Sequence, residues 1–139
     1  MTQLVRDAMT EGPVTMRHDA TVREAARRMK RANIGDVIVM RDRKAYGILT
    51  DRDIVVRCLA EAGEPTEMRI GDICSTGLVT VRPNDSLASA EALMRRRAVR
   101  RLVVEDHGVP VGILTLADLE RVRHPDSPMA DIAAAPPST

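Results

Sequence analysis

A threonine stands three residues before an aspartate in two places, at Thr50 and Asp53 and again at Thr115 and Asp118. Both pairs follow an apolar run, in the segments GILTDRD and GILTLAD. An ionised carboxylate accepts two hydroxyl groups at once, and the start of a helix offers free N–H groups to a phosphate. The same spacing is a capping box, in which the threonine and the acidic residue bond each other's backbone. Spacing alone favours the cap, and both interpretations stay open at this point.

A second group that could do chemistry is the basic run from Met94 to Arg101, in which five of the last seven residues are arginine. One interpretation is a face that follows nucleic-acid phosphates, and the other is a solvated helix side. The chain has 21 basic and 20 acidic residues, no Trp, no Phe and a single Tyr. With no overall field and no aromatic stacking platform, DNA or RNA binding is the weaker hypothesis. The helix expected after Thr21 is basic as well, with Arg23, Arg27, Arg28, Lys30 and Arg31.

Histidines and cysteines show no spacing typical of catalysis or metal binding. The three histidines lie before a helix (His18), in a predicted turn (His107) and before the tail (His124). None has the spacing from a cysteine or a carboxylate that is typical of a metal site or a catalytic triad. Cys58 and Cys74 are expected to be buried thiols without a disulfide. We therefore expect no enzyme activity and no metal site. Apolar runs such as Val37–Met40 are too short for a membrane span, and the N-terminus has no apolar core of a signal peptide, which predicts a cytoplasmic protein.

These residues must be positioned by a repeated unit. Residues 5–57 align with residues 70–122 at an offset of 65 without a gap, and 14 of the 53 pairs are identical. The two Thr-x-x-Asp segments are the densest part of the match. Such a repeat indicates two copies of one small unit, and neither copy of about 55 residues would bury enough surface to be secure alone.

Each copy predicts the order strand, helix, strand, strand, helix. In the first copy we expect a strand at Val14–Met16, a helix capped by Thr21, strands at Val37–Met40 and Tyr46–Leu49, and a second helix from Thr50. The first two strands can be parallel through the helix, and the last two form an antiparallel hairpin. The fold class is therefore α/β, with two units packed about a pseudo-twofold axis.

With its gapless repeat, its paired Gly-Ile-Leu-Thr-x-x-Asp segments and the stretch from Val99 to Val104, the chain resembles a tandem pair of CBS domains. Among them it is similar to stand-alone bacterial signalling proteins of the hypoxic response protein type. We expect a first unit at 1–62, a linker at 63–69, a second unit at 70–123 and a flexible Pro/Ala-rich tail at 124–139.

The resemblance implies a regulatory module that binds an adenosine-containing ligand, such as AMP, ADP, ATP, S-adenosylmethionine or NAD, in the cleft between two CBS units. By position, Asp53 and Asp118 would accept hydrogen bonds from ribose hydroxyls, and Thr50 and Thr115 would bond ribose or phosphate. The segments around Thr15 and Thr80 would meet the adenine through backbone groups. Two such modules commonly stack, so the resemblance also implies a homodimer.

Arg100 and Arg101 lie at the entry to a buried strand, where members of this family often keep basic residues that face the phosphates of the ligand. The first copy has Gly35 and Asp36 there, which departs from that pattern. We therefore expect two unequal clefts. Two alternatives stay open: a dimerisation or partner-binding scaffold with empty clefts, and an Arg-rich nucleic-acid-binding protein.

Overall fold

The computed structural model describes residues 2–126 and 128, and it divides the chain into two compact units. The first-copy unit is Pro13–Leu78, and the second-copy unit is Met1–Gly12 together with Val79–Thr139. The boundaries of these units differ from those of the sequence repeats. The opening residues of the first repeat, up to Gly12, belong to the second-copy unit, and those of the second repeat, up to Leu78, belong to the first-copy unit. The tail expected at 124–139 lies outside the described residues, apart from 124–126 and 128.

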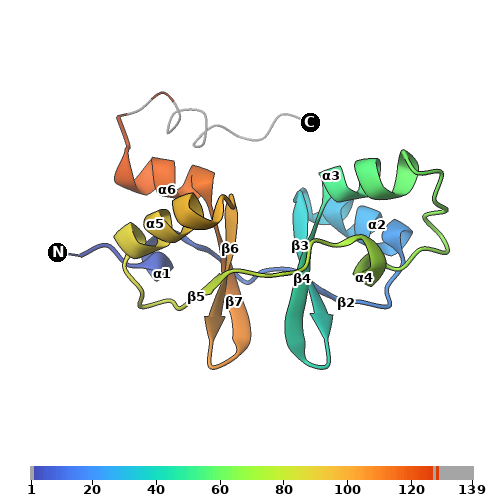
Figure 1. The fold of residues 1–139 in the computed structure, drawn as a ribbon, viewed down its shortest axis with the longest axis horizontal. Helices are drawn as coiled ribbons and strands as arrows, with labels where there is room; N and C mark the ends of the chain where they lie inside the picture. Colours follow the sequence, from blue (N-terminus) through green and yellow to red (C-terminus); the bar gives the residue numbers. More distant parts are fainter. Residues whose placement is uncertain (1, 127, 129–139) are drawn as a thin grey trace. The chain divides into compact units, whose positions relative to one another are not determined.

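The first-copy unit contains a three-stranded sheet in the order β2-β3-β4 (Figure 1). Strand β2 (Thr15–Arg17) is parallel to β3 (Asp36–Arg41), which is antiparallel to β4 (Lys44–Thr50). The helices of this unit are α2 (Val22–Ala32), α3 (Asp51–Asp53), which continues as the π-helix η1 (Ile54–Leu59), and α4 (Ile70–Ile73). The predicted element order and strand directions are confirmed.

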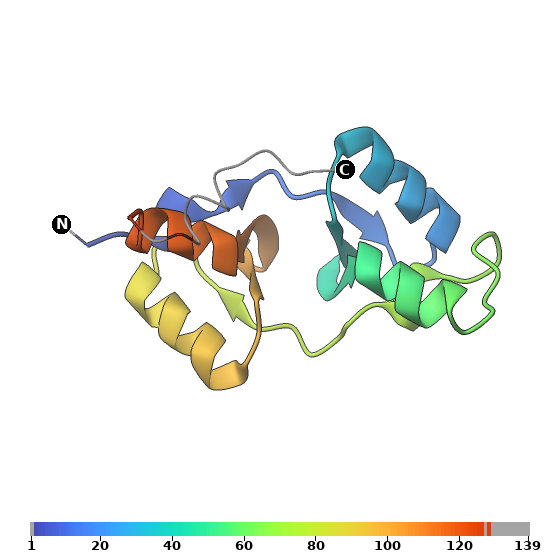
Figure 2. The same cartoon turned by 90° about the horizontal axis from the view of Figure 1, so that it is seen from above.

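The second-copy unit repeats this arrangement and adds a strand. Its elements are β5 (Thr80–Val81), α5 (Leu87–Arg97), β6 (Arg101–Asp106), β7 (Val109–Thr115) and α6 (Leu116–Arg123), preceded by α1 (Val5–Ala8) and β1 (Thr10–Glu11). Strand β1 pairs antiparallel with β7, so the sheet order is β1-β7-β6-β5. Figure 2 shows α5 and α6 beside the strands of this unit.

Each unit has its own apolar core, built from equivalent positions of the two copies. Val22, Met29 and Leu49 are buried in the first-copy unit, as are Leu87, Met94 and Leu114 in the second. Helices α2 and α5 both stop at a residue in the left-handed conformation, Asn33 and Ala98, each with φ of 53°. No helix in the described part of the chain is long and apolar enough to cross a membrane.

The paired Gly-Ile-Leu-Thr segments need glycine for a steric reason. A Cβ atom on Gly47 would lie 2.7 Å from both the Cys74 Sγ and the Ser75 backbone oxygen. In the other copy, a Cβ atom on Gly112 would lie 2.7 Å from the Met9 Sδ and 2.9 Å from a backbone oxygen. The opening residues of each repeat therefore pack directly against the strand, in the other repeat, that leads to the threonine and the aspartate.

Both cysteines are free thiols buried in the core of the first-copy unit, which confirms the interpretation from sequence. Burial first, and then the negative charge of Asp53, raises the pKa of the Cys74 thiol. A buried thiol with a raised pKa is a poor nucleophile and a packing residue.

Candidate functional site

The sheet register brings the predicted residues of the first copy to one end of one sheet face. Thr15 of β2 pairs with Ile38 of β3, and Asp36 at the start of β3 pairs with Thr50 at the end of β4. Side chains of directly paired residues point to the same side of a sheet, and alternate residues of one strand share a face. Thr15, Asp36 and Thr50 therefore share the face opposite the core residue Leu49.

The second copy has the same layout with one change of charge. Thr80 of β5 pairs with Val103, and Arg101 at the start of β6 pairs with Thr115 at the end of β7. Thr80, Arg101 and Thr115 share the face opposite Leu114, which lies in the core. Within each unit, the sheet thus brings two predicted site threonines that are 35 residues apart in sequence to the same face: Thr15 and Thr50, and Thr80 and Thr115.

Both aspartates form the capping box that their spacing predicts. The Thr50 backbone N–H donates to Asp53 Oδ2 at 2.9 Å, and the Asp53 N–H donates to Thr50 Oγ1 at 3.1 Å. Thr115 and Asp118 repeat these two bonds at 2.9 and 3.1 Å. Asp53 and Asp118 are only 9% and 5% exposed, and they are the buried acidic residues of the described chain. The caps fix each carboxylate against the end of its strand.

The second oxygen of each carboxylate is used differently in the two units. Asp53 Oδ1 lies 3.8 Å from the Arg57 Nε, whereas Asp118 Oδ1 accepts a hydrogen bond from an Arg121 guanidinium nitrogen at 2.9 Å. Arg57 also donates to the carbonyl of Ile73 at 3.2 Å, which ties η1 to α4. A carboxylate has about four lone-pair sites, so both can accept further bonds, and Asp53 has the more open oxygen. Arg57 and Arg121 were not predicted as site residues, although a spacing of four or three residues from an aspartate on one helix is a signal that points to such pairs.

The residues that differ between the copies stand on identical backbones. The N–H of Asp51 donates to the Gly35 carbonyl at 3.0 Å, and the N–H of Leu116 donates to the Arg100 carbonyl at 2.9 Å. The strand entry is Gly35-Asp36 in one unit and Arg100-Arg101 in the other, with Arg100 exposed and Arg101 half-buried. The strand entry of the first-copy unit therefore carries one negative charge, whereas that of the second-copy unit carries two positive charges.

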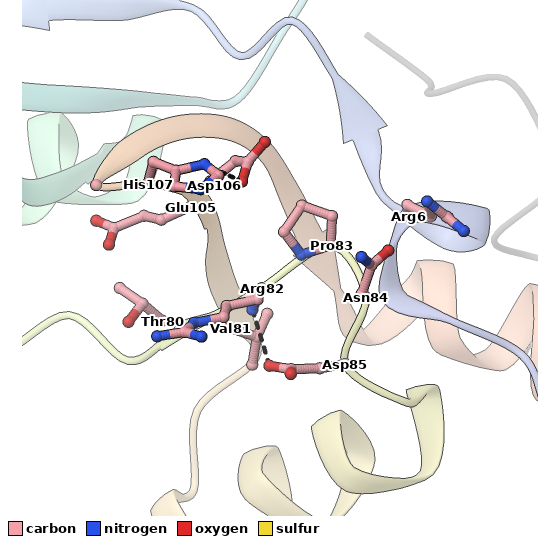
Figure 3. A pocket seen from close by; sticks show the side chains of 11 residues that line it. Arg6, Thr80, Val81, Arg82, Pro83, Asn84, Asp85, Glu105, Asp106 and His107 are labelled. Atoms are coloured by element: carbon pink, nitrogen blue, oxygen red, sulfur yellow. Dashed lines mark hydrogen bonds and ion pairs between the residues drawn. The ribbon is translucent and has the colours of Figure 1, made fainter.

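A hollow of about 750 Å³ lies elsewhere on the second-copy unit (Figure 3). It is bordered by β5, the loop that follows it, Arg6 and the β6–β7 turn, and Thr80 is the one predicted site residue in its lining. Two of its acids are already engaged: Asp85 accepts from the Arg82 N–H at 2.8 Å, and Asp106 pairs with His107 at 2.8 Å. We place the candidate site at the strand ends, because there the same geometry recurs in both units.

Two of the three histidines, His107 and His124, lie next to surface carboxylates. His124 lies 3.2 Å from Glu91, which also pairs with Arg123, and the hydrogen bond from His124 lowers the pKa of Glu91. Among residues 2–126 and 128, no group of three or more His, Cys, Asp or Glu side chains could hold a metal ion.

Comparison with known protein families finds the same two-copy repeat in this chain. The family model for the CBS domain matches residues 5–59 and 70–133. A CBS domain-containing protein of Bacillus subtilis, YhcV, is 39% identical over 115 residues, which cover 83% of this chain and 81% of that protein.

Hypoxic response protein 1 of Mycobacterium tuberculosis is 34% identical over 118 residues, covering 84% of this chain and 82% of its own. A crystal structure of hypoxic response protein I with two coordinated zinc ions has a TM-score of 0.74 at 30% identity, covering 86% of this chain and 98% of that one. A hexameric CBS-CP12 protein from bloom-forming cyanobacteria has a TM-score of 0.79 at 29% identity, covering 92% and 77%.

Proposed function

Since the chain belongs to the CBS domain family, with two CBS units in tandem, we propose that this regulatory module binds an adenosine-containing nucleotide at the strand ends of its units. The observation that carries the proposal is the geometry repeated in both units. In each unit a threonine on the sheet face opposite the core caps the following helix, and the buried aspartate of the same capping box follows it three residues later. A site built twice on the same backbone suits a ligand with hydroxyls at a fixed spacing, such as ribose.

In this proposal Asp53 and Asp118 accept hydrogen bonds from ribose hydroxyls through the lone pairs that the caps leave open. Thr50 and Thr115 bond ribose or phosphate, and the backbone at Thr15 and Thr80 meets the adenine. We propose binding without catalysis, as in a stand-alone pair of CBS domains, and among the described residues no cluster could hold a catalytic metal.

The two units should bind with different strength. Gly35-Asp36 and Arg100-Arg101 differ by three charges over two aligned positions. A guanidinium bonds a phosphate bidentately, whereas a carboxylate in its place repels it. We therefore propose one tight nucleotide per chain and a second that is weak or absent.

Isothermal titration of the full chain with AMP, ADP, ATP, S-adenosylmethionine and NAD tests the proposal, with GMP as the control for the base. We expect saturable binding of at least one adenosine compound, and a rise in melting temperature at saturating ligand. Binding of none of the five, with no thermal shift, would leave the scaffold alternative as the function.

The module is also proposed to be a homodimer, because η1 exposes apolar side chains. Val55, Val56 and Leu59 are 56%, 43% and 55% exposed, and Leu116 on α6 is 40% exposed. Ile54 and Leu119 on the same two helices are instead buried in the cores, at 9% and 1% exposure. A row of exposed apolar side chains on one helix is typical of an interface.

A further inference from the structure

Helix α2 carries a row of exposed arginines. Arg23, Arg27 and Arg31 follow one another at four-residue spacing, and all three are exposed. A rise of 1.5 Å per residue gives this α2 arginine row a length of about 12 Å. Within residues 2–126 and 128, none of the three side chains makes an ion pair, while Arg28 and Lys30 add further positive charge to the helix.

The stability of the helix does not account for this row. Like charges four residues apart repel each other, and Arg23 lies in the first turn, where the helix dipole disfavours a cation. The second copy serves as an internal control, because α5 has Ala88 and Ala92 at the positions of Arg23 and Arg27. The unit therefore folds without these two cations.

The row borders a surface hollow of about 350 Å³, lined by Thr21, Arg23, Glu24, Arg27 and Thr66. The Arg23 N–H donates to the Pro65 carbonyl at 2.9 Å, which holds the loop containing Thr66 against the start of the helix. Thr66 in turn donates to Glu64 at 3.0 Å. Two guanidinium groups and two threonines thus meet in a recess with a carboxylate at its edge.

We propose that the α2 arginine row binds an acidic segment of a partner protein. Glutamates at four-residue spacing on a facing helix would repeat every 6 Å, which is the spacing of the arginines. Each glutamate could therefore form an ion pair with one arginine. A duplex nucleic acid would extend far beyond 12 Å and bring its phosphates against Glu24 and Glu64. The net charge of +1 provides no long-range attraction for such a polyanion or for an anionic membrane.

The test uses the full chain without nucleotide, so that its outcome is independent of the proposed nucleotide site. The probe is a fluorescent helical peptide with three glutamates at four-residue spacing, and its control replaces each glutamate with glutamine. The variant Arg23→Ala/Arg27→Ala/Arg31→Ala removes the row and keeps good helix formers. The matched control, Arg95→Ala/Arg96→Ala/Arg97→Ala, removes the same charge from α5.

We expect the glutamate peptide to bind and the glutamine peptide not to bind in fluorescence anisotropy at 50 mM salt. The α2 triple variant should lose roughly five- to fiftyfold in affinity, since three exposed ion pairs are removed, while the α5 variant stays close to the wild type. Equal losses in both variants, or no peptide binding, would overturn the proposal. Binding of a DNA duplex or of phosphatidylserine vesicles that is tighter than peptide binding and depends on the α2 arginines would also overturn it. Circular dichroism checks that each variant is folded.

Discussion

Replacing Asp53 separates its role in the helix cap from its proposed role in nucleotide binding. The carboxylate accepts the Thr50 N–H at 2.9 Å through Oδ2, and its other oxygen makes only the 3.8 Å contact with Arg57. In Asp53→Asn the amide oxygen can still accept the Thr50 N–H, so the cap survives without the charge. In Asp53→Ala both the cap and the charge are lost.

The two variants therefore predict different pairs of results. Loss of one cap costs about 1 kcal/mol, which for a chain of this size lowers the melting temperature by roughly 3 to 6 °C in Asp53→Ala. The melting temperature of Asp53→Asn should stay within about 1 °C of the wild type, on the same scale. Hydrogen bonds to a charged acceptor contribute about 1.5 to 3 kcal/mol, so both Asp53 variants should weaken AMP binding at the first-copy unit roughly ten- to a hundredfold, and Asp118→Asn should weaken the tight site of the second-copy unit by a similar factor.

Circular dichroism melts and isothermal titration with AMP measure the two effects separately. Glu24→Ala is the matched control, because Thr21 and Glu24 form a capping box of the same kind on α2, outside the proposed site. It should lower the melting temperature and leave AMP affinity unchanged. If neither Asp53→Asn nor Asp118→Asn weakens AMP binding, both carboxylates are caps only and the ribose assignment is refuted.

Light scattering of the wild type at micromolar concentration should give the mass of a dimer, and Val55→Asp/Leu59→Asp should give a monomer, because a charge on each exposed site opposes apolar contact. Arg101→Ala should weaken AMP more than uncharged adenosine, and titration should find one tight site per chain; equal losses for both ligands would contradict the phosphate role. Because the pKa of Glu91 is lowered in the folded state, its contribution to stability is present above its unfolded pKa of about 4.3 and is lost as pH falls through the folded value. Melting temperatures from pH 6 to 3 should therefore fall less in Glu91→Gln than in the wild type.

The fold could be predicted because its determinants are local and occur twice. The cap of α2 depends on Thr21 and Glu24, which are three residues apart, and the structure contains both of their hydrogen bonds. The hairpin strands were recognisable from short apolar runs on either side of a charged turn. The same signals placed Thr50 and Thr115 at strand ends, where the structure has them.

Other features depend on contacts between segments distant in sequence, which spacing does not reveal. The N-terminal segment does not belong to the unit that follows it in sequence. Met1–Gly12 belongs to the second-copy unit instead. The burial of Ile54 and Leu119 depends on the rotation of each helix about its own axis, and η1 adopts π-helical bonding that has no signal in the apolar pattern.

Comparison of the two copies shows where a difference in function can reside. The hydrogen bonds of the two caps have identical lengths, and the strand pairs Asp36–Thr50 and Arg101–Thr115 occupy the same register. The two strand entries therefore have the same register, and the exchange of a carboxylate for a guanidinium changes the charge opposite the capping threonine. A ligand that carries both a ribose and a phosphate experiences this change, whereas one that carries only the ribose experiences much less of it. The contrast between AMP and adenosine is consequently the measurement that separates a ligand-selective pair of sites from a scaffold whose two copies have diverged only in surface charge.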